Sequence, residues 1–312
     1  INAEYGGLKM LRLPKKATPN NSAIASIQNA IQMLLSALPE IKSGQDEAEI
    51  KKQRQFVVQS IRALQVIRRS VIQAQPNQKL EFLQQDKYLD LIIQTLLFDI
   101  DQNQSEIDKV QLLSLDIISM HLLDQPQTDN LILIHENFLP ALHKLFVRSI
   151  LRKHFKCVQK IVRIIFDLCH SQYNPKIVMY DSHCIFILQN TLNLKADDYQ
   201  GDEFEALIAI KYVVQSLLKL SSIDELQLSC QHLYGEFLVK VIEQNIIDDE
   251  TTLLICSTIK NLYTQHNCIF KVEVEILAHL INLIQEIDIA QVQEFVKEFS
   301  TLIDNNVGQV NE

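Results

Sequence analysis

The sequence predicts an all-α solenoid, a stack of similar helical units that together bury one continuous core. Apolar residues recur at three- and four-residue spacing over most of the chain, and alternating strand patterns with Gly or Asn-Gly turns are absent. Only 6 Gly and 7 Pro occur in 312 residues, so few turns interrupt the helices. The longer helices start at intervals of roughly 40 to 58 residues, close to the 40–47 residues of helical repeat arrays.

The expected elements follow one another as helix pairs. Residues 1–20 are polar, with Gly and Pro, which favours a flexible arm or linker. A helical repeat domain is expected over 21–304, followed by a frayed tail over 305–312. The apolar stripes predict helices over 21–38 and 46–73, over 88–100 and from 105, over 138–149 and from about 151, over 184–194 and from 202, after Gly235 and from 249, and over 271–285 and 289–304.

The stretch from Asn137 to Leu192 resembles an armadillo repeat. FLPALHKLF at 138–146 resembles the second helix of such a repeat, 158–170 resembles the long third helix, and NPKIVMYD at 174–181 resembles the next short first helix. Similar short helices are expected at 77–85, 128–136 and 222–232. The resemblance implies a right-handed α-solenoid of about six armadillo-like units, with HEAT-type units as the related alternative.

The resemblance also implies a binding scaffold, whose third helices line a groove for extended partner segments. In the nuclear-import adaptors of this family, regularly spaced Trp and Asn in that groove bind basic peptides. Aligning the third helices places Ile117, Arg163, Gln215 and Ser257 at the Trp positions, and His121, Asp167, Lys219 and Asn261 at the Asn positions. Only Asn261 matches and the chain has no Trp, so a receptor for localisation signals is not favoured. The groove-lining candidates are His121, Asp167, Gln215, Lys219, Ser257 and Asn261.

A basic strip is the sharpest candidate for partner binding. Arg148, Arg152, Lys156, Lys160 and Arg163 recur at helical spacing and cover about a third of one helix face if a continuous helix carries them. Such a strip could bind an acidic or phosphorylated segment. The alternative is a solvated face whose aliphatic stems cover apolar surface. Nucleic acid is disfavoured because the chain is acidic overall, at −9, and lacks interleaved aromatic residues.

Charge is unevenly distributed along the chain. Residues 1–170 carry 21 Lys and Arg against 17 Asp and Glu, a formal charge of +4. Residues 171–312 carry 8 against 21, a formal charge of −13. This bipolar distribution suggests two surfaces with different electrostatic preferences. The acidic groups at 197–205 and 248–250 are expected mainly to stabilise helix N-termini.

Nothing in the sequence indicates catalysis, a cofactor or a metal. The motifs of α/β-hydrolases, P-loop proteins, zinc proteases and dinucleotide-binding proteins are absent. Cys169-His170 and His183-Cys184 lack metal-ligand spacing. Most of the six Cys lie in apolar helical patterns, so reduced core thiols in a cytoplasmic protein are expected. No apolar run is long enough to span a membrane.

The function expected is a non-enzymatic scaffold or adaptor that binds an extended or helical partner segment along the concave groove. One alternative is a regulatory module of a larger protein, resembling the armadillo-like modules of formins or chaperone cofactors. Ile1 as first residue and the polar arm favour that alternative. Another is a phosphate- or polyanion-binding module that uses the basic strip. The sequence leaves the partner and the oligomeric state open.

Overall fold

The computed structural model describes residues 21–37, 47–85, 87–98, 104–122, 131–171, 174–199, 201–244, 247–264 and 271–309, and every regular element in these ranges is a helix. The all-α prediction is therefore confirmed for the described residues. The expected arm over 1–20 lies outside them. The final helix continues to Gln309, five residues beyond residue 304, the predicted end of the domain.

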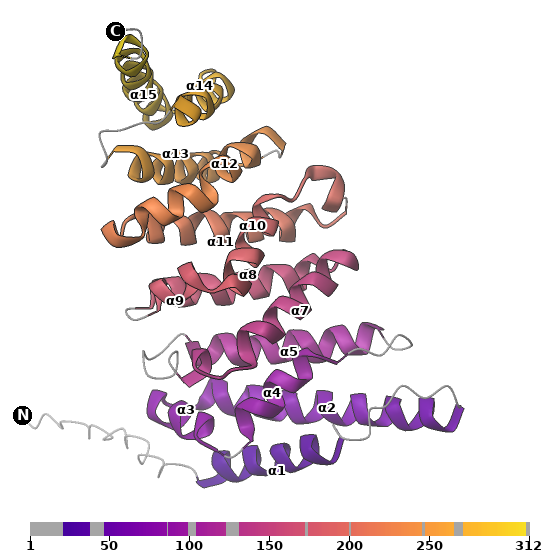
Figure 1. Ribbon diagram of the computed structural model, residues 1–312. Coiled ribbons are helices and arrows are strands. Elements are labelled where there is room, and N and C mark those ends of the chain that lie inside the picture. The colour runs from indigo at the N-terminus through magenta and orange to yellow at the C-terminus, as the bar shows by residue number, and fades with distance from the viewer. Residues whose placement is uncertain are drawn as a thin grey trace, which may run out of the picture.

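The helices pack as consecutive pairs. The pairs are α1 (Asn21–Ala37) with α2 (Glu47–Gln73), α4 (Tyr88–Leu96) with α5 (Gln104–Leu122), α7 (Phe138–Leu151) with α8 (Phe155–His170), α10 (Ser182–Leu192) with α11 (Glu203–Ser221), α12 (Gln227–Gln244) with α13 (Asp249–Thr264), and α14 (Lys271–Ile284) with α15 (Ala290–Gln309). Figure 1 shows the pairs stacked along one direction, from α1 and α2 at one end to α14 and α15 at the other.

Two layers result from this stacking. The second helices of the pairs pack on one another in chain order, from α2 through α5, α8, α11 and α13 to α15. The first helices pack on one another as well, from α1 through α4, α7, α10 and α12 to α14. Short helices join successive pairs: α3 (Pro76–Leu83), α9 (Pro175–Tyr180) and η3 (Asp224–Leu226). A further short helix, η2 (Ala196–Tyr199), lies within a pair, between α10 and α11. Pro76 and Pro175 occupy the first helical position, where a missing N–H costs nothing.

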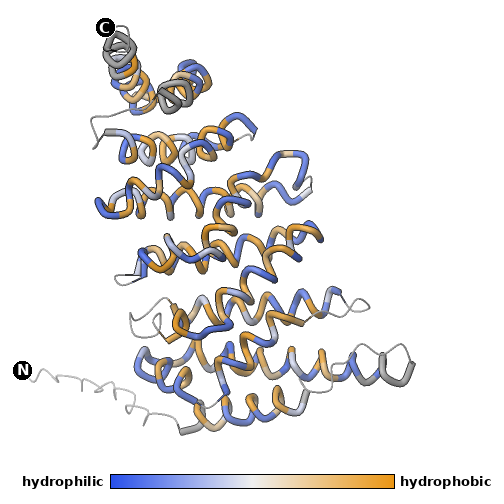
Figure 2. Tube along the Cα trace, viewed as in Figure 1, coloured by the Kyte–Doolittle hydropathy of each residue, from blue (hydrophilic) through white to orange (hydrophobic). Residues whose placement is uncertain are grey.

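The core is continuous along the stack. One cluster of buried apolar side chains extends from Ile27 in α1 to Phe299 in α15. Helix α8 is an example of how each long helix contributes to this core. Its apolar stripe is almost fully buried and consists of Phe155, Val158, Ile161 and Leu168. Figure 2 shows apolar residues concentrated where neighbouring helices meet. Each such large side chain contributes about 1.5–3 kcal/mol, and no single pair could enclose its stripe alone.

The predicted helix from about 151 is wrong at its start. Helix α7 continues through Leu151, and α8 begins only at Phe155. Between them the backbone N–H of His154 donates to the carbonyl of Ser149 at 2.8 Å, and Lys153 adopts a φ of 55°. This left-handed residue reverses the chain, so that α8 folds back onto α7. No Gly or Pro marks the turn, so the sequence pattern places the break a few residues too early.

Gly235 also lies elsewhere than expected. The sequence places it before a helix, but it is buried in the middle of α12. A Cβ atom at this position would lie 2.7 Å from the hydroxyl oxygen of Tyr263 in α13. Glycine therefore permits close approach of α12 and α13, at the cost of its low helix propensity.

This close approach can be tested by a double-mutant cycle. We expect Gly235→Ala to destabilise the protein by about 1 kcal/mol, because the steric cost exceeds the gain in helix propensity. In a Tyr263→Phe background the obstructing oxygen is gone, and the same substitution should be neutral or stabilising. Urea unfolding of the four proteins measures the coupling. An equal cost in both backgrounds would contradict the close approach.

Candidate functional site

The long-helix face is the accessible surface of α2, α5, α8, α11, α13 and α15. Polar side chains connect successive helices across this face, and we call the set the polar ladder. It consists of Arg68, Asp116, Lys160, Arg163, Tyr212, Lys211, Glu250, Lys260 and Glu298. Each rung joins two helices that are neighbours in the stack, so the ladder fixes their register.

Asp116 of α5 contacts two other members of the polar ladder, on two different helices. Its carboxylate pairs with Lys160 of α8 on one side, and its Oδ2 lies 3.4 Å from Nε of Arg68 in α2 on the other. The side chains of Asp116 and Lys160 are only 23% and 29% exposed, so solvent screens this pair less than a surface pair. One carboxylate thus connects three consecutive long helices.

Arg163 connects α8 to α11. Its Nη1 donates to the hydroxyl of Tyr212 at 2.8 Å, and its Nε donates to the carboxylate of Asp167 at 3.0 Å. The guanidinium also lies 5.0 Å from the centroid of the Tyr212 ring and 5.3 Å from that of Phe166. Arg163 is therefore held on three sides within the fold.

The structure divides the predicted basic strip between two helices and the turn that joins them. Arg148 lies on α7, where its Nη1 donates to the carbonyls of Leu97 at 3.3 Å and Phe98 at 3.1 Å, at the end of α4. Lys160 and Arg163 belong to the polar ladder. Arg152 and Lys156 are exposed, in the turn and in the first turn of α8. The expectation of one continuous basic helix face is wrong, because the helix is interrupted between Leu151 and Phe155.

The predicted groove-lining residues do not all lie on the same face of the stack. His121 is 1% exposed, and its Nε2 lies 2.9 Å from the hydroxyl of the buried Tyr88 in α4. It faces the first-helix layer, so its expected place in a groove is wrong. Asp116 occupies the accessible side of α5 instead.

The remaining candidates lie on or near the long-helix face. Asp167 is paired with Arg163, and Asn261 of α13 donates to the hydroxyl oxygen of Ser221 in α11 at 3.2 Å. Ser257 is exposed and donates to the carbonyl of Leu253 at 2.8 Å. Gln215 is half-buried and Lys219 is exposed, both on α11.

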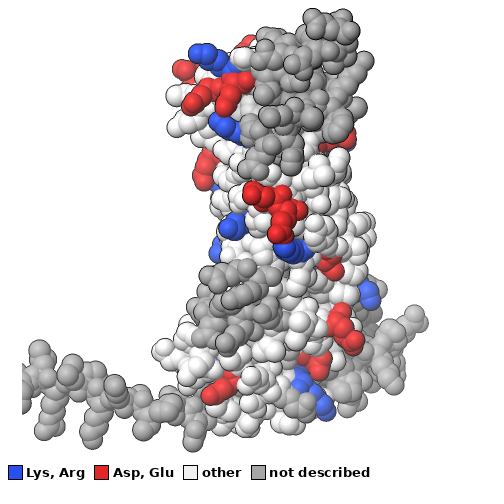
Figure 3. Space-filling model, turned by 60° about the vertical axis from the view of Figure 1, so that its left-hand side comes forward, with Lys and Arg blue, Asp and Glu red and all other residues white. Residues whose placement is uncertain are grey.

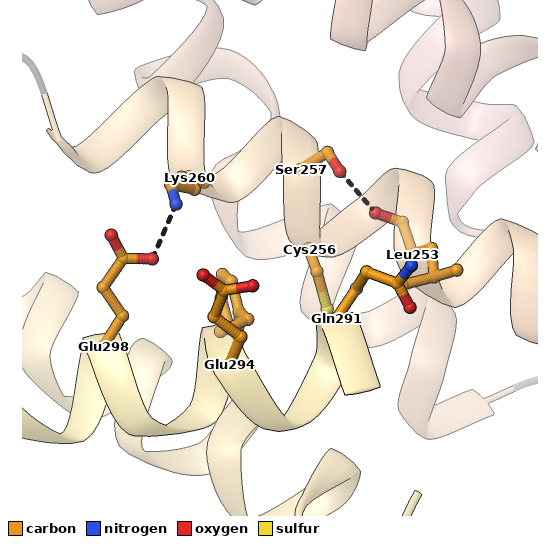
Figure 4. A pocket seen from close by; sticks show the side chains of 8 residues that line it. Leu253, Cys256, Ser257, Lys260, Gln291, Glu294 and Glu298 are labelled. Atoms are coloured by element: carbon orange, nitrogen blue, oxygen red, sulfur yellow. Dashed lines mark hydrogen bonds and ion pairs between the residues drawn. The ribbon is translucent and has the colours of Figure 1, made fainter. Parts of the chain in front are cut away.

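A small cavity opens between α13 and α15 (Figure 4). It has a volume of about 160 Å³, and the Lys260–Glu298 ion pair closes one end at 2.7 Å. Ligand pockets usually hold about 300–1,000 Å³. Burial raises the pKa of the Cys256 thiol in this cavity to about 12, so the sulfur is protonated at neutral pH. The cavity is therefore smaller than a usual ligand pocket, and its one thiol is protonated.

The other described cysteines are also protonated thiols in the core. Cys157, Cys169, Cys184 and Cys230 are buried and unbridged, and burial raises the pKa of each thiol. Cys268 lies outside the described residues. Among the residues that the structure describes, no three His, Cys, Asp or Glu side chains are arranged to hold a metal ion.

The acidic groups at the helix starts have local partners. Asp248 accepts the backbone N–H of Thr251 at 2.7 Å, and hydrogen bonds from the side chain and the backbone of Thr251 lower the pKa of Asp248. Asp198 accepts the N–H of Lys195 at 2.9 Å, and Glu203 accepts that of Gly201 at 3.0 Å. Figure 3 shows acidic and basic side chains in small mixed groups on the face it views, without a strip of one sign.

The length and apolar character of the helices bear on whether any of them could cross a membrane. No single helix in the described ranges is long and apolar enough to cross a bilayer, although Glu203–Ser221 and Asp224–Gln244 pass the same criteria jointly, with a bend of 110° between them.

Two histidines meet in the first-helix layer. Nδ1 of His143 in α7 lies 2.8 Å from Nδ1 of His183 in α10, so one nitrogen donates and the other accepts. The ring of Phe186 covers His143 at a centroid distance of 4.3 Å. Burial lowers the pKa of His143 and the neighbouring His183 lowers it further, whereas Asp181 acts in the opposite direction. The pair therefore disfavours an added proton.

Comparisons with known proteins found one structure of similar fold and nothing that bears on function. No protein-family model and no curated protein matches the chain. A solved structure described as an engineered protein aligns with 89% of this chain and 96% of its own, with a TM-score of 0.50 and 11% identity. At that identity the likeness concerns the fold alone.

The polar ladder makes a prediction about stability. Lys160→Glu places a carboxylate opposite Asp116 in a half-buried setting and should destabilise the protein by about 2 kcal/mol. Exchanging the charges in the double variant Lys160→Glu/Asp116→Lys should recover part of that loss, although Arg68 then faces a cation. Denaturant unfolding measures both. A double variant as unstable as the sum of the single variants would show that the pair is not coupled.

The histidine pair makes a prediction about pH. The pKa of His143 in the folded protein is below its value of about 6.5 in the unfolded chain, so the unfolded state takes up protons first and stability is lost as pH falls through that range. We expect His183→Gln to reduce the loss of unfolding free energy between about pH 7.5 and about pH 5.5, because it removes the second imidazole. The exposed His232→Gln is the matched control. Identical pH profiles for His183→Gln and the wild type would refute the coupling.

Proposed function

We propose that this chain is a non-enzymatic scaffold that binds an extended or helical segment of a partner protein along the long-helix face. The supporting observation is the packing of six second helices in chain order, bridged by the polar ladder, in the residues that the structure describes. Such an arrangement presents a long surface with a repeating backbone and varied side chains, which suits an extended ligand.

The finer architecture is part of this proposal. We assign the stack to the armadillo-like or HEAT-type solenoids, as a right-handed array of about six units. The short helices α3 and α9 before the longer ones support the armadillo-like version. The buried, unbridged thiols are compatible with a reducing compartment, and we place the protein in the cytoplasm.

The partner segment proposed is acidic or phosphorylated. Lys156 on α8 and Lys219 on α11 are exposed on neighbouring long helices. Neither belongs to the polar ladder, so both can turn toward a ligand without breaking a helix contact described here. Lys160 and Arg163, in contrast, make contacts between helices. Their substitution would lower stability, so a loss of binding could not be separated from a loss of folding.

Charge reversal at these positions tests the proposal. The double variant Lys156→Glu/Lys219→Glu should weaken binding of acidic and phosphoserine-containing peptides by about fivefold to tenfold, because two favourable charge contacts become unfavourable. Lys144→Glu, exposed on α7 in the other layer, is the matched control and should change little. Fluorescence anisotropy with acidic, phosphorylated, neutral and basic peptides of equal length gives the affinities. Equal affinity for all four classes would argue against an acidic partner.

A further inference from the structure

A second cleft lies between α7 and α10, in the first-helix layer. It has a volume of about 360 Å³, and its apolar lining includes Val147, Ile150, Leu151, Phe155, Phe186 and Leu194. Of these residues only Phe155 belongs to a long helix, and it forms the buried floor. The cleft is therefore separate from the long-helix face.

Three large apolar side chains are exposed in this cleft. Leu151 is 79% exposed, the largest value among the exposed large apolar residues of the described chain, and Val147 and Phe186 are also exposed. Isolated exposed apolar residues are ordinary, but a group around a concavity indicates a contact surface. The apolar part of the cleft favours an apolar side chain of a ligand, because contact removes both apolar surfaces from water.

The walls of the cleft are held in place by the fold. Phe186 packs edge-on against Phe146, at a ring-centroid distance of 6.4 Å, and lies tilted against His143. At the end of α7, the N–H of Arg152 donates to the carbonyl of Arg148 at 3.0 Å, and the N–H of Lys153 donates to that of Ile150 at 3.0 Å. The cleft is therefore preformed, which lowers the entropic cost of binding.

Opposite charges stand on the two walls. Lys153 lines the cleft from the turn after α7, and Asp198 lines it from η2, after α10. Both are exposed, and no ion pair between them occurs among the described contacts. The carboxylate of Asp198 is oriented by the N–H of Lys195. A ligand that fits would carry an anion on the Lys153 side and a cation on the Asp198 side.

The shape of the cleft favours a protein segment over a small molecule. Small-molecule sites bury about 70–90% of the ligand surface. A cleft whose rim residue Leu151 is 79% exposed is too open for that. Interfaces between proteins, in contrast, commonly place one bulky apolar side chain in a pocket with charged residues around it.

We propose that the α7–α10 cleft binds a bulky apolar anchor residue of a partner protein, with an acidic neighbour facing Lys153 and a basic neighbour facing Asp198. This is a second docking site, and it does not depend on binding along the long-helix face. The apolar walls supply the affinity, and the two opposite charges fix the direction of the bound segment.

A displayed random-peptide library tests this directly. Peptides are selected on the full 312-residue chain, synthesised with a fluorophore and titrated against variants. Leu151→Asn should weaken the selected peptides by at least about tenfold, the loss typical of an anchor contact. Leu228→Asn, a half-exposed apolar position on α12, is the matched control and should leave affinity unchanged. Because Leu151 is largely exposed, its substitution should leave thermal unfolding unaltered.

Charge swaps test the direction of binding. Peptides that bind the cleft should weaken with Lys153→Glu and regain affinity when their acidic residue is replaced by Lys. The variant Lys156→Glu/Lys219→Glu should not affect them, which separates this site from the long-helix face. The proposal is overturned if the library returns no peptide that Leu151→Asn weakens, or if Leu228→Asn weakens the peptides equally.

Discussion

The structure depends on one constraint: each long helix must bury its apolar stripe against its neighbours in the stack. Helices α5, α8, α11 and α13 each pack between two other long helices and against the first-helix layer. Their stripes are almost fully buried, as in α8 from Phe155 to Leu168. No pair can satisfy this requirement alone, so the units fold as an array and their spacing is set by side-chain packing.

That close spacing determines the chemistry of the long-helix face. Neighbouring helices bring polar side chains 38 to 49 residues apart into contact, as in Lys160 with Asp116, Arg163 with Tyr212 and Lys260 with Glu298. Half-buried charges need such partners, because an unpaired one would lose its hydration without compensation. The consequence is a face of largely neutralised pairs. Recognition there must come from the exposed residues between the pairs and from clefts at the helix ends.

The sequence predicts much of the fold and little of the site. Apolar spacing located both helices of each pair, usually to within a few residues, because amphipathic stripes carry that information directly. The break between α7 and α8 was placed a few residues too early, near 150, since the left-handed residue at the turn is Lys153 and not Gly. His121 was placed in the groove, although it is buried beside Tyr88 of the first-helix layer. Gly235 was taken as a boundary although it serves a close helix contact. The partners of Asp116 lie far away in sequence, and no local pattern reveals them.

The change from net positive to net negative charge along the sequence can be located in the structure. The basic part of the chain ends within α8, and the acidic part begins before α9. Because α7 and α10 are adjacent in the first-helix layer, that change of sign falls across the α7–α10 cleft. Lys153 lines one wall and Asp198 the other. A stack of similar units would otherwise offer equivalent clefts, so the change of sign gives this one a direction that packing alone cannot supply.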